Sequence, residues 1–175
     1  MATVAKVRKE AVRSPAHRAV AAALSSYRKI GLDTICFIYH LSKDPRYLPI
    51  TSALFSLIES GKLTAVTSSL TLVEILTRPK QLGHQAAAES YRVALATFPN
   101  LELRRSDIAI TERAAELRAR YRLATPEAIQ LATALVESAQ VFIGNTSSLR
   151  AVKELDIMLL EDLRAGVSTP SVRRA

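Results

Sequence analysis

Residues 30–42 read IGLDTICFIYHLS, a short apolar run that ends at a carboxylate and leads directly into a helical pattern. The same order recurs along the chain, where short apolar runs alternate with longer segments whose apolar residues repeat at helical spacing. Strands that alternate with helices are typical of an α/β fold, with a parallel central sheet of four to five strands and helices on both faces. In such a sheet, functional side chains lie just beyond the carboxyl ends of the strands.

The positions of the elements follow from the apolar spacing and from the residues that end helices. Strands are expected at 30–32, 63–66, 101–103, 141–143 and 157–160. Helices are expected at 34–42, 48–60, 70–78, 83–97, 107–121, 126–138 and 147–154. Gly61 is expected to end the second of these helices and Pro79 the third.

The composition excludes several classes of protein. The chain has 175 residues, of which 49% are hydrophobic, so it is long enough to bury a core as one domain. The mean hydropathy is only +0.12 and no apolar run reaches the roughly 18 residues of a membrane helix. Cys36 is the single cysteine, which excludes an internal disulfide and argues against a zinc site. We therefore expect a cytoplasmic protein without a membrane span.

The positive charge lies at the two ends of the chain. Residues 1–29 have seven basic residues and one acid, and residues 163–175 have three basic residues and no acid, so their net charges are +6 and +3. Residues 30–162 have 14 basic and 15 acidic residues, a net charge of −1. We expect a basic N-terminal extension, a domain over 30–162 and a basic tail. Such ends either bind nucleic acid or anionic lipid, or are merely solvated.

Four side chains are expected to meet at the carboxyl edge of the sheet. Asp33 follows the first strand, Glu74 lies on the helix after the second, Glu127 opens the helix at 126–138, and Thr146 follows the fourth strand. Three carboxylates that converge repel one another unless a cation lies between them. Oxygen ligands of this kind suit Mg²⁺ or Mn²⁺.

Each of these residues also has a purely structural interpretation. Asp33 and Thr146 could cap the helices that follow them. Glu74 could close a capping box at its own helix start, or pair with Arg78 one turn later. Glu127 in a first turn is favoured by the helix dipole.

Four stretches carry a resemblance to a known family. They are GLDTICFIYHL (31–41), VTSSLTLVEILTRP (66–79), LATPEAIQLATAL (123–135) and VFIGNTSSLRAV (141–152). Together, and in this order, they resemble the motif regions of PIN-domain nucleases, and most of all the VapC-like toxin ribonucleases of toxin–antitoxin pairs. The resemblance covers about 30–162. It implies a PIN-like three-layer fold, a metal-dependent ribonuclease, and a first and second acid at Asp33 and Glu74.

Two positions depart from the family pattern. The third acid is usually Asp, and here it is Glu127, whose carboxylate reaches one methylene further. The fourth acid usually follows an Asn, whereas here Asn145 is followed by Thr146. The site thus keeps three of four negative charges, which should weaken its affinity for a cation. A catalytically impaired PIN scaffold that binds RNA or a protein is therefore the alternative to an active enzyme.

The resemblance implies a role for each residue of the site. Asp33 and Glu127 would hold Mg²⁺ or Mn²⁺, and Glu74 would complete the metal site or orient the attacking water. Thr146, Asn145 and Thr34 would hydrogen-bond that water or a phosphate oxygen of the substrate. The expected reaction is attack of water on an RNA phosphodiester. The expected partners are RNA, an antitoxin protein laid across the acidic site, and a second copy in a homodimer.

Overall fold

The computed structural model describes residues 14–168 and contains a parallel sheet of five strands in the order β3-β2-β1-β4-β5. The strands are β1 (Lys29–Leu32), β2 (Thr64–Ser68), β3 (Leu101–Arg104), β4 (Val141–Gly144) and β5 (Asp156–Leu159). The first strand, β1, lies in the centre, β2 and β3 follow outward on one side of it, and β4 and β5 lie on its other side. The strand order therefore reverses between β1 and β4, which is where a doubly wound sheet places its ligands. The predicted fold class is confirmed.

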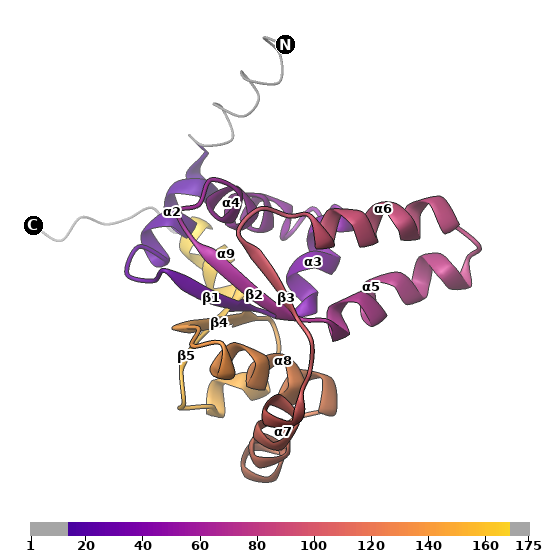
Figure 1. Cartoon of the computed structure of the whole chain (residues 1–175). Helices are drawn as coiled ribbons and strands as arrows, with labels where there is room; N and C mark the ends of the chain where they lie inside the picture. Colours follow the sequence, from indigo (N-terminus) through magenta and orange to yellow (C-terminus); the bar gives the residue numbers. More distant parts are fainter. Residues whose placement is uncertain (1–13, 169–175) are drawn as a thin grey trace, which may run out of the picture.

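Helices form layers on both faces of the sheet (Figure 1). Those described are α2 (Pro15–Ala23), α3 (Thr34–Leu41), α4 (Leu48–Glu59), α5 (Leu70–Gln81), α6 (Gln85–Ala96), α7 (Ile108–Tyr121), α8 (Thr125–Val136), the 3₁₀ turn η1 (Ser147–Ala151) and α9 (Leu160–Ser168). One face carries α2, α3, α4 and α9, and the other carries α7, α8 and η1. Helices α5 and α6 form a hairpin that projects beyond the β3 edge (Figure 1).

The strands bury both faces, because successive side chains point to opposite sides. Ile30 and Leu32 pack into the core beneath α2, α3, α4 and α9, together with Val141 and Ile143. Phe142, between those two, packs into the second core beneath α7 and α8. Continuous apolar runs of this kind are expected of strands that are covered on both sides.

A glycine in β1 sets the distance between the sheet and α8. A Cβ atom at Gly31 would lie 2.4 Å from the Cβ of Ala134 and 2.9 Å from the ring of Phe142. No side chain fits in that space, so α8 can lie directly on β1. This close approach brings the start of α8 to the carboxyl end of the sheet.

Two predicted helices differ from the structure. Pro79 does not end α5, which continues to Gln81 and ends before Gly83 in the left-handed conformation. A proline inside a helix removes one N–H donor and crowds the carbonyl of the preceding turn, and here its ring is buried beside α6. The helix predicted at 147–154 is the shorter 3₁₀ turn η1. Gly61, by contrast, follows the end of α4 at φ +74, as predicted.

The periodicity does not predict α2 and α9, and both contribute to the core. Ser14 caps α2 and Pro15 occupies its first turn, where a proline costs no hydrogen bond. Val20 and Leu24 are buried against the layer formed by α4 and α9. The basic residues of 1–13 and 169–175 lie outside the described residues. Within 14–168, no helix is long and apolar enough to cross a membrane.

Candidate active site

Asp33 stands at the point where β1 passes into α3. Its Oδ1 accepts a hydrogen bond from the backbone N–H of Ile35 at 3.1 Å, so the residue caps α3. Its own N–H donates to the carbonyl of Ile143 on β4 at 2.9 Å. Opposite, a Cβ at Gly144 would lie 3.3 Å from Asp33 Oδ2, so the glycine leaves room for the carboxyl group. The capping role and a place in the site are therefore compatible.

A cavity of about 230 Å³ opens at the carboxyl edge of the sheet, beside Asp33. It is lined by Asp33, Thr34, Ile35, Ile38, Glu74, Pro126, Glu127, Gln130 and Thr146. The fold thus brings together five of the six predicted site residues, from α3, α5, α8 and the segment after β4. The sixth, Asn145, does not line this cavity.

Glu74 reaches the cavity from α5. Its Oε2 accepts the hydroxyl proton of Thr34. The capping-box interpretation of Glu74 is wrong, because α5 begins at Leu70 after an N-cap at Ser69. Among the described residues it also forms no ion pair with Arg78. The exposed carboxylate is therefore held from the side of the core and faces the cavity.

Glu127 and Thr146 contribute differently. Glu127 lies in the first turn of α8, and its Oε2 accepts the backbone N–H of Ala124 at 3.2 Å. Its structural role at the helix start is therefore real, although the side chain also lines the cavity. Thr146 precedes η1 but its hydroxyl makes no capping bond, and the residue is exposed at the cavity.

Asn145 uses both ends of its amide outside the cavity. Oδ1 accepts the backbone N–H of Glu161 at 3.1 Å, at the start of α9, and Nδ2 donates to the hydroxyl of Tyr47 at 3.3 Å. Tyr47 in turn donates to Glu161 at 2.7 Å. These bonds connect the end of β4 to α9 and orient Asn145 away from the carboxylates.

The electrostatics of the cavity favour a positive charge. The pKa of Asp33 is raised to about 6, chiefly by burial and also by the negative charges of Glu74 and Glu127, against the opposing effect of the Ile35 N–H. Near neutral pH, the ionised form of Asp33 is therefore held at a cost in folding free energy. A cation in the cavity would offset that cost.

The donor set matches a hard divalent cation in kind. The polar atoms at the cavity are carboxylate, hydroxyl and amide groups, and ions such as Mg²⁺ prefer oxygen ligands and keep several waters. Residues 14–168 contain no group of three or more His, Cys, Asp or Glu side chains close enough to hold a metal ion as they stand. Asp33, Glu74 and Glu127 are the carboxylates that line the cavity, and Oε2 of Glu127 is bonded to the N–H of Ala124.

A cluster of buried polar side chains, which the sequence pattern does not predict, lies beneath these acids. Thr34, Thr67, Ser68, Thr71 and Gln130 are each at most 2% exposed and hydrogen-bond to one another. The only signal in the sequence was a glutamine among the alanines and leucines of 128–135. A buried amide in such a helix needs partners, because an unpaired one is costly.

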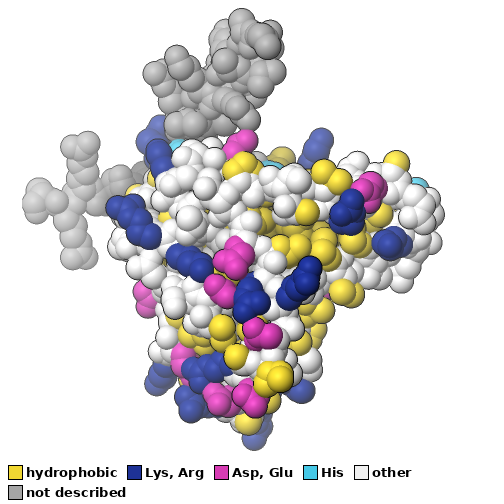
Figure 2. Space-filling view, in the orientation of Figure 1, with side chains coloured by type: hydrophobic (Ala, Val, Ile, Leu, Met, Phe, Trp, Pro, Cys, Tyr) yellow, Lys and Arg dark blue, Asp and Glu magenta, His cyan; other side chains and the backbone are white. Residues whose placement is uncertain are grey.

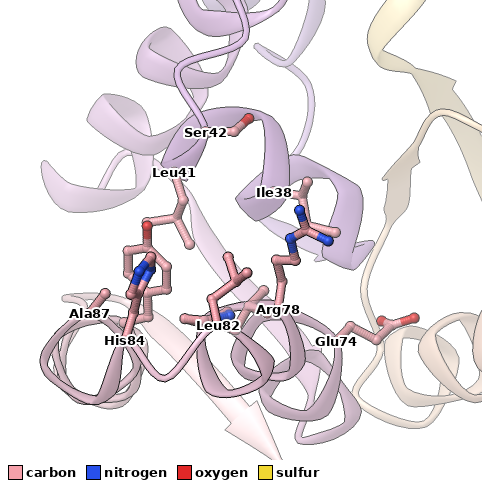
Figure 3. A pocket seen from close by; sticks show the side chains of 11 residues that line it. Ile38, Leu41, Ser42, Glu74, Arg78, Leu82, His84 and Ala87 are labelled. Carbon is pink, nitrogen blue, oxygen red and sulfur yellow. The ribbon is translucent and has the colours of Figure 1, made fainter.

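A second, largely apolar groove of about 310 Å³ adjoins the cavity, between α3, α5 and α6 (Figure 3). Ile38 and Glu74 line both spaces, so the groove leads to the acids. Leu82 is 51% exposed at its rim, and Arg78 extends along it toward Ile38 (Figure 3). Figure 2 shows further hydrophobic side chains gathered where the α5–α6 hairpin meets the β3 edge.

The doubly wound parallel sheet and the carboxylates at its switch point define a class of α/β proteins. Comparison with known families shows to which family of this class the chain belongs. The sequence model of the PIN domain matches residues 30–155, and the chain belongs to this family. No curated protein matches the chain at a significant level.

Solved structures of similar fold include two toxin–antitoxin complexes. One is a toxin–antitoxin complex from Klebsiella pneumoniae, with 23% identity and a TM-score of 0.57, covering 75% of this chain and 97% of that one. Another is VapBC2 from Rickettsia felis bound to a promoter DNA fragment, with 17% identity and a TM-score of 0.60, covering 75% and 98%. At these identities the likeness concerns the fold.

Proposed function

We propose that this protein is a metal-dependent endoribonuclease of the toxin type that hydrolyses RNA phosphodiester bonds. The observation that carries the proposal is the single cavity at the switch point of the sheet, where Asp33, Glu74, Glu127 and Thr146 converge. Membership of the PIN domain family supports it. Its expected location is the cytoplasm.

Different residues of the cavity would bind the metal ion and the phosphate group. Asp33, Glu74 and Glu127 would hold Mg²⁺ or Mn²⁺, and Glu127 keeps one carboxylate oxygen outside its bond to the Ala124 N–H. When bound, the ion would supply an activated water and neutralise charge on the phosphodiester. The Ile35 N–H fixes Asp33, and Thr146, whose hydroxyl makes no capping bond, would donate to a phosphate oxygen.

Two of the predicted substrate-binding residues fit a supporting role better. The hydroxyl of Thr34 donates its hydrogen bond to Glu74, so Thr34 would position that carboxylate rather than contact RNA. Asn145 is bonded to Glu161 and Tyr47, so it would fix the segment that carries Thr146.

The test is cleavage of a mixed RNA pool by the purified protein with Mn²⁺, with Mg²⁺ and with a chelator. Asp33→Asn is the matched variant, since Asn keeps the cap of α3. Ser148→Ala, an exposed change just beyond the cavity, is the control. Cleavage that needs both the metal and Asp33 supports the proposal, and equal cleavage by Asp33→Asn overturns it.

We further propose that an antitoxin protein and a second copy of the chain are its partners. The groove between α3, α5 and α6 leads directly to the acids, so an apolar peptide seated there would cover them. Leu82→Asp at the exposed rim should weaken inhibition by the antitoxin while leaving RNA cleavage intact. Light scattering after gel filtration tests the expected homodimer.

A non-catalytic scaffold is the second candidate. The bond between Glu127 and Ala124 and the uncharged Thr146 favour it, because both reduce the negative charge available to a cation. Absence of cleavage with any cation, from folded protein that still binds RNA, would establish this alternative.

A further inference from the structure

Gln130 lies directly beneath the carboxylates, and the proposed chemistry assigns it no task. Its side chain is 2% exposed, on the inner side of α8, and every polar atom of that side chain is bonded. Its partners come from α3, α5 and β2. The amide thus joins the three elements that carry or adjoin Asp33 and Glu74.

The orientation of the Gln130 amide is fixed by the backbone. The N–H of Ser68 donates to Gln130 Oε1 at 3.0 Å. A backbone N–H can only donate, so the atom facing it has to be the oxygen, and a flipped amide would set two donors against each other. Nε2 therefore faces Thr34 and Thr71, and both of their hydroxyl oxygens lie 2.8 Å away.

This orientation limits which atoms can accept the hydroxyl proton of Thr34. The amide Nε2 of Gln130 can only donate, so Thr34 Oγ1 accepts from it and keeps its own single proton for another partner. Two acceptors lie within reach of that proton, Oγ1 of Thr71 at 3.0 Å and Oε2 of Glu74, and the carboxylate oxygen is the stronger acceptor. Thr71 likewise accepts from Nε2, and it contacts Thr67 at 2.8 Å.

We propose that Gln130 is a positioning residue, which directs the hydroxyl of Thr34 onto Glu74 and so holds the Glu74 carboxylate as a fixed acceptor at the cavity. The expected effect on metal binding rests on the proposed function, whereas the hydrogen bonds among Gln130, Thr34 and Glu74 do not. Groups that orient a metal-ligating carboxylate typically change metal affinity by 10- to 100-fold when they are removed.

The test compares Gln130→Met with a matched control on the same helix. Met has a similar length and removes all hydrogen bonds of the amide. Thr133→Val is the control, because Thr133 is fully buried on α8 but bonds only to the carbonyl of Ile129, at 2.7 Å. Electron paramagnetic resonance of Mn²⁺ without RNA gives the affinity, and circular dichroism gives the melting temperature.

We expect Gln130→Met to weaken Mn²⁺ binding about 10-fold and Thr133→Val to leave it unchanged. Thr34→Val removes the final bond of the chain directly, so it keeps the question open to test if Gln130→Met does not fold. The double variant should bind Mn²⁺ no more weakly than Thr34→Val, because both changes break one path. Equal affinity of Gln130→Met and Thr133→Val, or effects that multiply, would overturn the proposal.

A measurement without metal separates this inference from the proposed function. Crystal structures of the metal-free variants should show Glu74 bonded to Thr34 in Thr133→Val and released from it in Gln130→Met. If the wild type binds no Mn²⁺, the proposed function fails and this comparison still decides the role of Gln130. A Glu74–Thr34 bond that persists in Gln130→Met contradicts it.

Discussion

At the scale of single residues, Asp33 has two opposite effects on the stability of the fold. Its oxygen caps α3 and stabilises the helix start. Its burial beside two other carboxylates makes the charged form unfavourable, which raises its pKa to about 6. Residues that are costly to the fold and gather at one cavity are typical of functional sites.

Replacing Asp33 by Asn should therefore stabilise the metal-free protein at pH 7.5. A raised folded-state pKa means that Asp33 favours folding below its unfolded value of 3.8 and that this advantage is lost as the pH rises through about 6. Asn keeps the cap without the charge, so the gain should be about 1 to 3 kcal/mol at pH 7.5. Urea unfolding of both proteins measures it.

The same pair of proteins provides the internal control. The difference in stability should shrink as the pH falls through 6. It should vanish below 3.8, where Asp33 is protonated in both the folded and the unfolded protein. A constant difference at all pH values would contradict the assignment of the effect to the charge of Asp33.

Thr146 is the position where a charge can be restored. Thr146→Asp should tighten Mn²⁺ binding by roughly 10-fold, because it adds a carboxylate at the cavity. It should also destabilise the metal-free protein by about 1 kcal/mol through repulsion among the acids. Calorimetric titration with Mn²⁺ measures the first effect.

Ser148→Asp is the control for this change, since Ser148 is exposed in η1 but does not line the cavity. The same gain in affinity from Ser148→Asp would show a general effect of charge, and would remove Thr146 from the site.

At the scale of elements, the contact between β1 and α8 depends on the absence of a side chain at Gly31. Gly31→Ala would place a methyl group 2.4 Å from that of Ala134, so the helix has to shift away from the strand. We expect a loss of about 1 to 3 kcal/mol in the free energy of unfolding, together with weaker Mn²⁺ binding, because α8 carries Glu127 and Gln130. Denaturant unfolding and metal titration measure the two effects.

Gly166→Ala is the comparison for Gly31→Ala. Gly166 lies in α9, and a Cβ atom there would meet nothing within 4 Å. Alanine in a helix is more favourable than glycine, so this variant should gain about 0.5 to 1 kcal/mol. If Gly31→Ala behaved like Gly166→Ala, the close approach would not limit the position of α8.

At the scale of the whole molecule, charge and chemistry are separated along the sequence. Residues 30–162 are nearly neutral in net charge and carry the acids of the cavity, whereas residues 1–13 carry Lys6, Arg8, Lys9, Arg13 and Glu10. A substrate of RNA would be repelled by the carboxylates and attracted by basic ends.

Removing residues 1–13 should weaken RNA binding and flatten its dependence on salt. If all four basic residues contact phosphates, the slope of log affinity against log salt should fall by about 3. Filter binding over a range of salt concentrations measures it. Removal of 169–175, with Arg173 and Arg174, should give about half that change, and an unchanged slope in both variants would assign RNA binding to the domain alone.

The apolar pattern of the sequence is sufficient to predict the order of the elements from β1 to β5, and the sheet edge at which Asp33 and Thr146 lie. Asp33 and Thr146 follow strands, and local apolar spacing is sufficient to find a strand and its end. Because the carboxyl ends of parallel strands share one edge, this also predicts which residues meet there.

The hydrogen-bond partners of each side chain, by contrast, are known only from the tertiary structure. Thr34 and Gln130 are 96 positions apart, and no local spacing relates them. The resemblance implied a substrate-binding role for Asn145, whereas the structure shows its amide bonded to the backbone N–H of Glu161 and the hydroxyl of Tyr47. Pro79 lies inside α5 with its ring buried beside α6, although proline is unfavourable within a helix. Local sequence fixes where an element begins, whereas hydrogen-bond partners depend on contacts that form only when the elements pack.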